Sequence, residues 1–188
     1  VAATAALAED LLAAAEATGP VTLSGPAGAG KRVLARWLHH ESGRADGPLL
    51  AHACGAHDPA SEERALFGPP AGAGGLLSRA RGGTLVLDDP ERLAPIVKAH
   101  LEAWLAGDQG SQSEDRAARL VLSTRSSLAT WIASGRLRAA LAQRLQRLEL
   151  HVPSLAERRE ELGALTRGLV GRFAREIGRP APELDDAA

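Results

Sequence analysis

Short apolar runs alternate with amphipathic stretches along most of this chain. Five runs of three to six residues are rich in Val, Leu and Ala and are bounded by Gly, Pro or polar residues. Near-continuous apolar runs of this length are typical of parallel strands that are covered on both faces. We therefore predict strands at residues 21–23, 49–54, 84–87, 119–123 and 148–152.

The segments between these runs show the 3.6-residue period of amphipathic helices. The clearest extends from Leu93 to Leu105, with Pro95 near its first turn, where proline is tolerated. We predict helices at residues 2–17, 31–41, 60–67, 93–105, 126–133, 136–146 and 156–176, with a helical turn at 76–80. The segments 42–48, 69–75 and 107–115 are predicted loops. Strands that alternate with helices indicate a parallel α/β sheet.

The connection after the first predicted strand carries the strongest chemical signal. It reads Gly25-Pro26-Ala27-Gly28-Ala29-Gly30-Lys31-Arg32 and leads directly into a helix. A strand, a glycine-rich turn, a lysine and a helix form the context of a phosphate-binding P-loop. Backbone N–H groups and the helix N-terminus would cradle phosphate oxygens, and Lys31 would add a full charge. The general pattern places Ser or Thr after the lysine, whereas Arg32 stands here. The alternative is a simple turn in a chain rich in Gly and Ala.

A second signal follows the third predicted strand, where Asp88 and Asp89 come directly after an apolar run. In an open α/β sheet, an acid at the carboxyl end of a strand lies beside the phosphate-binding loop. Asp88 is the candidate ligand for Mg2+, and Asp89 is the candidate for polarising an attacking water. The alternative is an ordinary pair of acids at a helix N-terminus. Together the loop and the acids predict a site for ATP and Mg2+.

Composition narrows the possible classes of protein. The formal net charge of -1 gives no bulk attraction to nucleic acid or to acidic membranes. The single cysteine, Cys54, excludes an internal disulfide and is expected to be a small buried residue. There is no apolar run of membrane-spanning length and no basic start before an apolar stretch, so we expect a cytoplasmic protein. The absence of Met suggests an internal domain of a longer chain.

The ordered set of motifs resembles the AAA+ ATPase domain of bacterial enhancer-binding proteins, the activators of sigma-54 RNA polymerase. Family members usually have Glu after the P-loop lysine, so the missing hydroxyl is not a departure from this family. The matching motifs are Gly25 to Lys31, Leu66-Phe67-Gly68, Gly82 to Asp88, Gly135-Arg136-Leu137-Arg138 with Arg144-Leu145, and Pro153-Ser154-Leu155 with Glu157 to Glu161.

The resemblance implies an α/β P-loop NTPase of AAA+ type, with a parallel five-stranded sheet flanked by helices. It implies a core over 1–153, the first helix of a truncated helical lid over 154–178, and a disordered tail over 179–188. Arg138 and Arg144 fall on the family arginines that reach a neighbouring subunit's nucleotide in a ring. By sequence pattern alone, a solvated helix face is the favoured interpretation of these arginines.

The sequence departs from the family at four places, which concern the positioning of the attacking water and the contact with sigma-54. The span 69–75 lacks the Phe and Thr of the sigma-contacting loop, which argues against direct contact with sigma-54. The family's Asp-Glu pair is Asp88-Asp89 here, which shortens the second acid by one methylene. The family's sensor asparagine falls on Arg125, a cation that cannot accept a hydrogen bond. The asparagine that restrains the catalytic glutamate falls on Ala53.

Three functions remain open on this basis. The first is an ATP-binding domain of a sigma-54-activator-like transcriptional regulator in which hydrolysis is weak or lost. The second is a working ring-forming ATPase that remodels a protein partner such as sigma-54 RNA polymerase. The third is a scaffold that has kept the fold and lost the nucleotide. We expect no direct DNA contact and no membrane contact from these residues.

Overall fold

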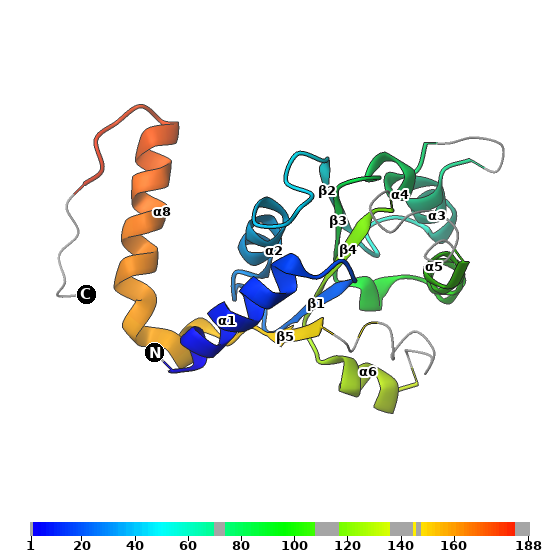
Figure 1. Cartoon of the computed structure of the whole chain (residues 1–188), viewed down its shortest axis with the longest axis horizontal. Helices are drawn as coiled ribbons and strands as arrows, with labels where there is room; N and C mark the ends of the chain where they lie inside the picture. Colours follow the sequence, from blue (N-terminus) through cyan, green and yellow to red (C-terminus); the bar gives the residue numbers. More distant parts are fainter. Residues whose placement is uncertain (1, 70–73, 108–116, 136–144, 146–147, 183–188) are drawn as a thin grey trace.

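The computed structural model describes residues 2–69, 74–107, 117–135, 145 and 148–182. Its centre is a five-stranded sheet in which every strand pair is parallel (Figure 1). In spatial order the strands are β2 (Leu49–Ala53), β3 (Thr84–Asp88), β4 (Arg119–Thr124), β1 (Val21–Ser24) and β5 (Glu149–His151). All five predicted strands are confirmed, with ends that differ by no more than one residue.

The predicted helices are largely confirmed. They are α1 (Ala2–Glu16), α2 (Lys31–His40), α3 (Pro59–Phe67), α4 (Leu76–Arg79), α5 (Pro95–Gly107), α6 (Leu128–Ala133) and α8 (Leu162–Glu176), with 3-10 turns η1 (Pro90–Arg92) and η4 (Leu155–Glu161). The helix predicted from 156 to 176 is divided, because Arg158 adopts a non-helical backbone (φ -130°, ψ 46°). The helix predicted at 136–146 lies outside the described residues except for Leu145.

Helices cover both faces of the sheet, as the apolar runs require. In β3, Leu85 and Leu87 pack with side chains of α3, α4, α5 and α6. Val86, between them, packs on the opposite face with side chains of α1 and α2. Successive side chains of a strand point to opposite faces of the sheet. A strand with helices packed on both faces therefore needs apolar residues at every position. The two cores therefore explain why the strands show no alternation of apolar and polar residues.

The strand order brings three connections to one edge of the sheet. Asp88 at the end of β3 is in register with Ser123 of β4, and Ser24 at the end of β1 is in register with Thr124. The segment after β4 therefore begins between the glycine-rich loop after β1 and the acids after β3. This juxtaposition brings together residues that are 56 positions apart (Arg32 and Asp88) and 36 positions apart (Asp89 and Arg125), and it creates the site described below.

The last helix, α8, stands away from the sheet (Figure 1). One face of this helix carries the apolar residues Leu162, Leu165, Leu169 and Phe173, and these side chains are 38–52% exposed. Division of the chain into a core over 1–153 and a lid segment over 154–178 stays a prediction. No helix in the described part of the chain is long and apolar enough to cross a bilayer.

Candidate functional site

The glycine-rich loop adopts a backbone that its glycines make possible. Gly25, Gly28 and Gly30 have φ angles of 149°, 78° and 91°, a region that L side chains rarely occupy. A Cβ atom on Gly25 would lie 2.2 Å from the carbonyl oxygen of Val152, so this glycine also allows close packing against the end of β5. A Cβ atom on Gly28 would meet no atom within 4 Å. The loop is therefore packed against the sheet at its start and open at its middle.

This open side of the loop forms one wall of a pocket of about 370 Å³. The pocket brings together the predicted loop residues and the predicted acids, and it adds two residues from the end of β4. Its lining is Ala27, Gly28, Gly30, Lys31, Arg32, Val33, Asp88, Asp89, Ser123 and Arg125. The remaining predicted loop residues, Gly25, Pro26 and Ala29, complete the turn behind this surface. Residues predicted from two separate motifs thus lie around a single cavity.

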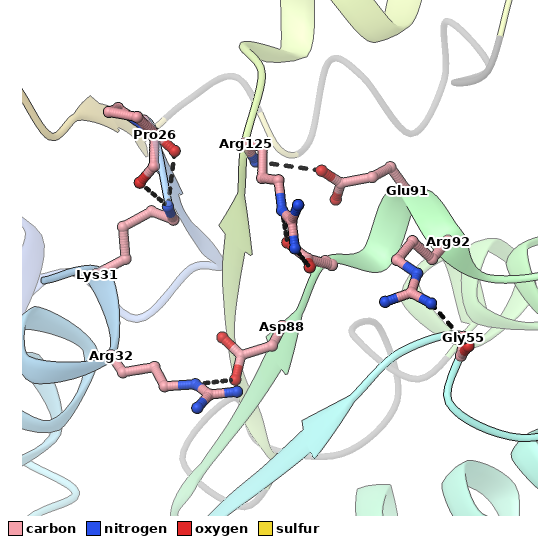
Figure 2. A network of polar contacts seen from close by, with 10 residues as sticks. Pro26, Lys31, Arg32, Gly55, Asp88, Glu91, Arg92 and Arg125 are labelled. Atoms are coloured by element: carbon pink, nitrogen blue, oxygen red, sulfur yellow. Dashed lines mark hydrogen bonds and ion pairs between the residues drawn. The ribbon is translucent and has the colours of Figure 1, made fainter. Parts of the chain in front are cut away.

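Lys31 is folded back under the loop. Its Nζ donates to the carbonyl oxygens of Gly25 at 2.6 Å and Pro26 at 2.7 Å (Figure 2). Burial lowers the pKa of this ammonium group, and the nearby carboxylate of Asp89 opposes that shift. The loop carbonyls thus hold the positive charge at the base of the pocket, where an anion can reach it.

The first turn of α2 faces the same cavity. Gly30 is the N-cap in a left-handed conformation, and no side chain caps the helix. A helix leaves its first N–H groups without partners in the helix and has a partial positive charge at this end. Val33 in this turn is apolar, yet its side chain is 62% exposed and lines the pocket. The helix start is therefore available to an anionic ligand.

Asp88, the predicted Mg2+ ligand, is paired with Arg32. The Arg32 Nε donates to Asp88 Oδ2 at 2.6 Å (Figure 2). The Asp88 side chain is 12% exposed and that of Arg32 is 74% exposed. A cation at Asp88 must therefore share this carboxylate with a guanidinium group that approaches from solvent.

Asp89, the predicted water-polarising acid, is paired with Arg125. The guanidinium donates from Nη2 to Oδ2 at 2.7 Å and from Nε to Oδ1 at 3.1 Å. Asp89 is in the left-handed region (φ 51°, ψ 50°), alone among the non-glycine residues that the structure describes. The hydrogen bonds to Asp89 and the charge of its carboxylate raise the pKa of the Arg125 guanidinium.

Two residues at the site have no counterpart in the sequence predictions. Glu91 in η1 accepts a hydrogen bond from the backbone N–H of Arg125 at 3.1 Å, which fixes the start of that segment (Figure 2). Arg158 in η4 donates to the carbonyl oxygen of Ala29, so the segment after β5 touches the loop. Neither contact has a sequence signal, because each joins elements that meet only in the folded chain.

Other predicted residues cannot be placed. Arg138 and Arg144, the candidate arginines for a neighbouring subunit's nucleotide, lie outside the described residues. So do residues 70–73, which form most of the span where the sigma-contacting loop is expected.

The described residues fit a phosphate group better than a magnesium ion. Phosphate oxygens would meet the open loop, the uncapped helix start and the Lys31 ammonium. The described carboxylates that line the pocket are those of Asp88 and Asp89, and both already receive hydrogen bonds from arginine. Mg2+ prefers carboxylate and water oxygens in octahedral geometry, so it would have to compete with Arg32 for Asp88.

Comparison with known proteins agrees with this architecture. A family model described as the Sigma-54 interaction domain matches residues 2–151. The response regulator protein PilR of Pseudomonas aeruginosa is 33% identical over 183 residues, which cover 90% of this chain and 41% of PilR. NtrX from Brucella abortus in complex with ATP has a TM-score of 0.81 at 29% identity, covering 98% of this chain and 44% of NtrX. Its complex with ADP has a TM-score of 0.83 at 28% identity, covering 99% and 43%.

The chain spans less than half the length of these relatives. The matched region nevertheless includes the loop, both acids and all five strands. The chain therefore belongs to the sigma-54 interaction domain family and has the AAA+ P-loop fold of that family.

Proposed function

We propose that this domain binds ATP or ADP in the loop pocket and hydrolyses ATP weakly or not at all, within a sigma-54-activator-like transcriptional regulator of the cytoplasm. The observation that carries the proposal is the arrangement of charge around the pocket. The loop backbone and the start of α2 are open to the pocket, whereas Asp88 and Asp89 are both engaged by arginine.

Binding is supported by three donors that converge on one cavity. They are the loop backbone between Gly25 and Gly30, the uncapped start of α2 and the Lys31 ammonium. Each favours an anion, and together they match the chain of phosphates in a nucleotide. NtrX, which shares this fold at 29% identity, was crystallised with ATP and also with ADP.

The hydrogen bonds that Asp88 and Asp89 accept from arginine support weak hydrolysis. Hydrolysis needs a carboxylate that accepts a hydrogen bond from the attacking water, and both Asp89 oxygens accept from Arg125 instead. It also needs Mg2+ to neutralise charge on the phosphates, and the Mg2+ ligand Asp88 is bonded to Arg32. Arg32 and Arg125 would themselves supply positive charge to phosphates, so binding does not require the metal.

A working ATPase is the second candidate, because both pairs are at the surface. Arg32 is 74% exposed and Arg125 is 61% exposed, so water screens each pair and either arginine can leave for a phosphate oxygen. Asp89 would then be free to order water, and Arg138 and Arg144 of a neighbouring copy would complete the site in a ring. Engagement of sigma-54 RNA polymerase belongs to this second candidate.

The test measures binding and turnover separately on the purified domain. We expect ATP and ADP to raise the melting temperature with EDTA present, and a coupled assay with Mg2+ to show turnover near background at all protein concentrations. Turnover that rises steeply with protein concentration would favour the ring-forming ATPase. No thermal shift with any nucleotide, with or without Mg2+, would favour the scaffold and overturn the proposal.

A further inference from the structure

A second cluster of polar side chains lies away from the loop pocket, at the carboxyl end of the edge strand β2. His52 is the last residue but one of β2, and Cys54 is the first residue of the turn that follows the strand. Glu62 reaches the same place from the first turns of α3. The N-cap residue Asp58 accepts hydrogen bonds from the backbone N–H groups of Ala60 and Ser61, which fixes where this helix begins.

The three side chains converge closely. The His52 Nε2 lies 3.0 Å from Glu62 Oε1, and one possible ligand atom from each residue lies within 4.8 Å of the other two. Neighbouring ligand atoms around a tetrahedral zinc ion are about 3.3–3.8 Å apart, given bonds of roughly 2.0–2.3 Å. Small side-chain adjustments therefore suffice to place all three donors around one ion.

We propose that His52, Cys54 and Glu62 bind a zinc ion that joins the edge strand β2 to α3. One imidazole nitrogen, one sulfur and one carboxylate oxygen form a donor set that suits this borderline-soft cation. The site has three protein ligands, so a water molecule would take the fourth position. This proposal is independent of nucleotide binding.

The surroundings support a metal site. Glu62 is 1% exposed and Cys54 is 2% exposed, so two of the donors are removed from competing water. The backbone N–H of Gly55 donates to Glu62 Oε1 at 2.7 Å and holds the carboxylate toward His52. Hydrogen bonds of this kind orient the ligands of metal sites.

The alternative is a simple hydrogen bond between His52 and Glu62, with Cys54 as an ordinary core residue. The zinc site and the simple hydrogen bond differ in the role of the Cys54 sulfur. A zinc ion requires the thiolate, whereas the hydrogen bond between the imidazole and the carboxylate is made without it. Experiments that report on Cys54 therefore distinguish them.

The experiment titrates the reduced, purified chain with Co2+ as a spectroscopic probe and then with Zn2+ in competition. We expect one ion per chain and a thiolate-to-cobalt charge-transfer absorption that Zn2+ abolishes. Cys54→Ser should remove this absorption, and His52→Gln should weaken zinc binding by about tenfold or more. The matched control is His57→Gln, because His57 is exposed in the same segment and should leave binding unchanged.

The change in melting temperature on adding Zn2+ distinguishes loss of zinc binding from a folding defect. Circular dichroism and melting without metal first establish that Cys54→Ser folds. Zn2+ should then raise the melting temperature of the original chain and of His57→Gln, but not that of Cys54→Ser. A folded original chain without the cobalt–thiolate absorption, or a Cys54→Ser variant that binds zinc as tightly as the original, would overturn the proposal.

Discussion

Arg125 and Asp89 form a bidentate ion pair across the ends of β4 and β3, with an Nη2–Oδ2 distance of 2.7 Å and an Nε–Oδ1 distance of 3.1 Å. An arginine has five N–H donors and no acceptor, so it cannot orient a water molecule through that water's hydrogens. Here it also occupies both oxygens of the neighbouring acid. Arg125 at the end of β4 therefore leaves Asp89 without a free oxygen for an attacking water.

Releasing Asp89 from Arg125 should raise the rate of ATP hydrolysis. We expect Arg125→Asn to raise ATP turnover by about tenfold, because the amide frees the carboxylate and can itself accept a hydrogen bond. Adding Asp89→Glu should raise turnover further, because the longer side chain reaches closer to the attacking water. A coupled assay with Mg2+ measures both, and Arg125→Lys is the control that keeps the positive charge. Background turnover in the double variant would mean that hydrolysis is limited elsewhere.

The Lys31 ammonium should dominate nucleotide affinity. We expect Lys31→Ala to weaken ATP and ADP binding by about 10- to 100-fold, which is the effect of losing a charge-assisted hydrogen bond. Calorimetry or nucleotide-dependent thermal shift measures the change. Arg36→Ala is the matched control, since this cation lies on the exposed side of the same helix. Equal losses in the two variants would indicate a general effect of charge on α2 rather than a phosphate contact.

Arg32 should determine how strongly Mg2+ contributes to binding. In the original chain we expect Mg2+ to change ATP affinity by less than about threefold, because Arg32 already bonds Asp88. Arg32→Ala should make ATP binding depend on Mg2+ by about tenfold, since the carboxylate becomes free. Affinities measured with EDTA and with excess Mg2+ give this ratio. Arg32→Lys keeps a competing cation and should behave like the original chain, and a strong Mg2+ dependence in that original chain would contradict the prediction.

The loop glycines should differ in their importance for stability. A Cβ atom on Gly25 would lie 2.2 Å from a backbone oxygen of Val152, whereas one on Gly28 would meet nothing within 4 Å. We expect Gly25→Ala to lower the free energy of unfolding by about 2–4 kcal/mol through the clash. Gly28→Ala should cost about 1 kcal/mol, from its left-handed backbone alone. Urea unfolding of both variants provides the comparison, and similar losses would argue against close packing of the loop on β5.

Acid should destabilise the domain partly through His39. This side chain is 3% exposed, with Nδ1 3.0 Å from Thr84 Oγ1, and burial lowers its pKa below the ordinary 6.5. As the pH falls below the unfolded pKa, the unfolded chain binds a proton that the folded chain resists, so stability is lost.

The stability of His39→Gln should depend less on pH between about pH 5 and 7 than that of the original chain. Urea unfolding across this range measures the slope. The exposed His57 provides the control, because His57→Gln should leave the slope unchanged. If the slope of His39→Gln equals that of the original chain, the acid sensitivity arises from other groups.

The sequence by itself determined the elements of this domain. The five strands, most of the helices and the glycine-rich loop were predictable because their signals are local. Uninterrupted apolar runs indicate strands of a sheet that helices cover on both faces. The glycines of the loop allow positive φ angles, and this requirement is local to a few residues. The position of Asp88 beside the loop also followed, since parallel strands bring their carboxyl ends to one edge.

Only the tertiary structure decided how charge is distributed at that edge. Arg32 and Asp88 are 56 residues apart in the chain, and Asp89 and Arg125 are 36 apart. These pairs form because strand register and the left-handed turn at Asp89 bring the side chains within hydrogen-bond distance. The same holds for His52 and Glu62, which meet where α3 returns to the edge strand. Sequence patterns report which segments form strands and helices, whereas the pairing of distant charges depends on distances of a few ångströms that only packing sets.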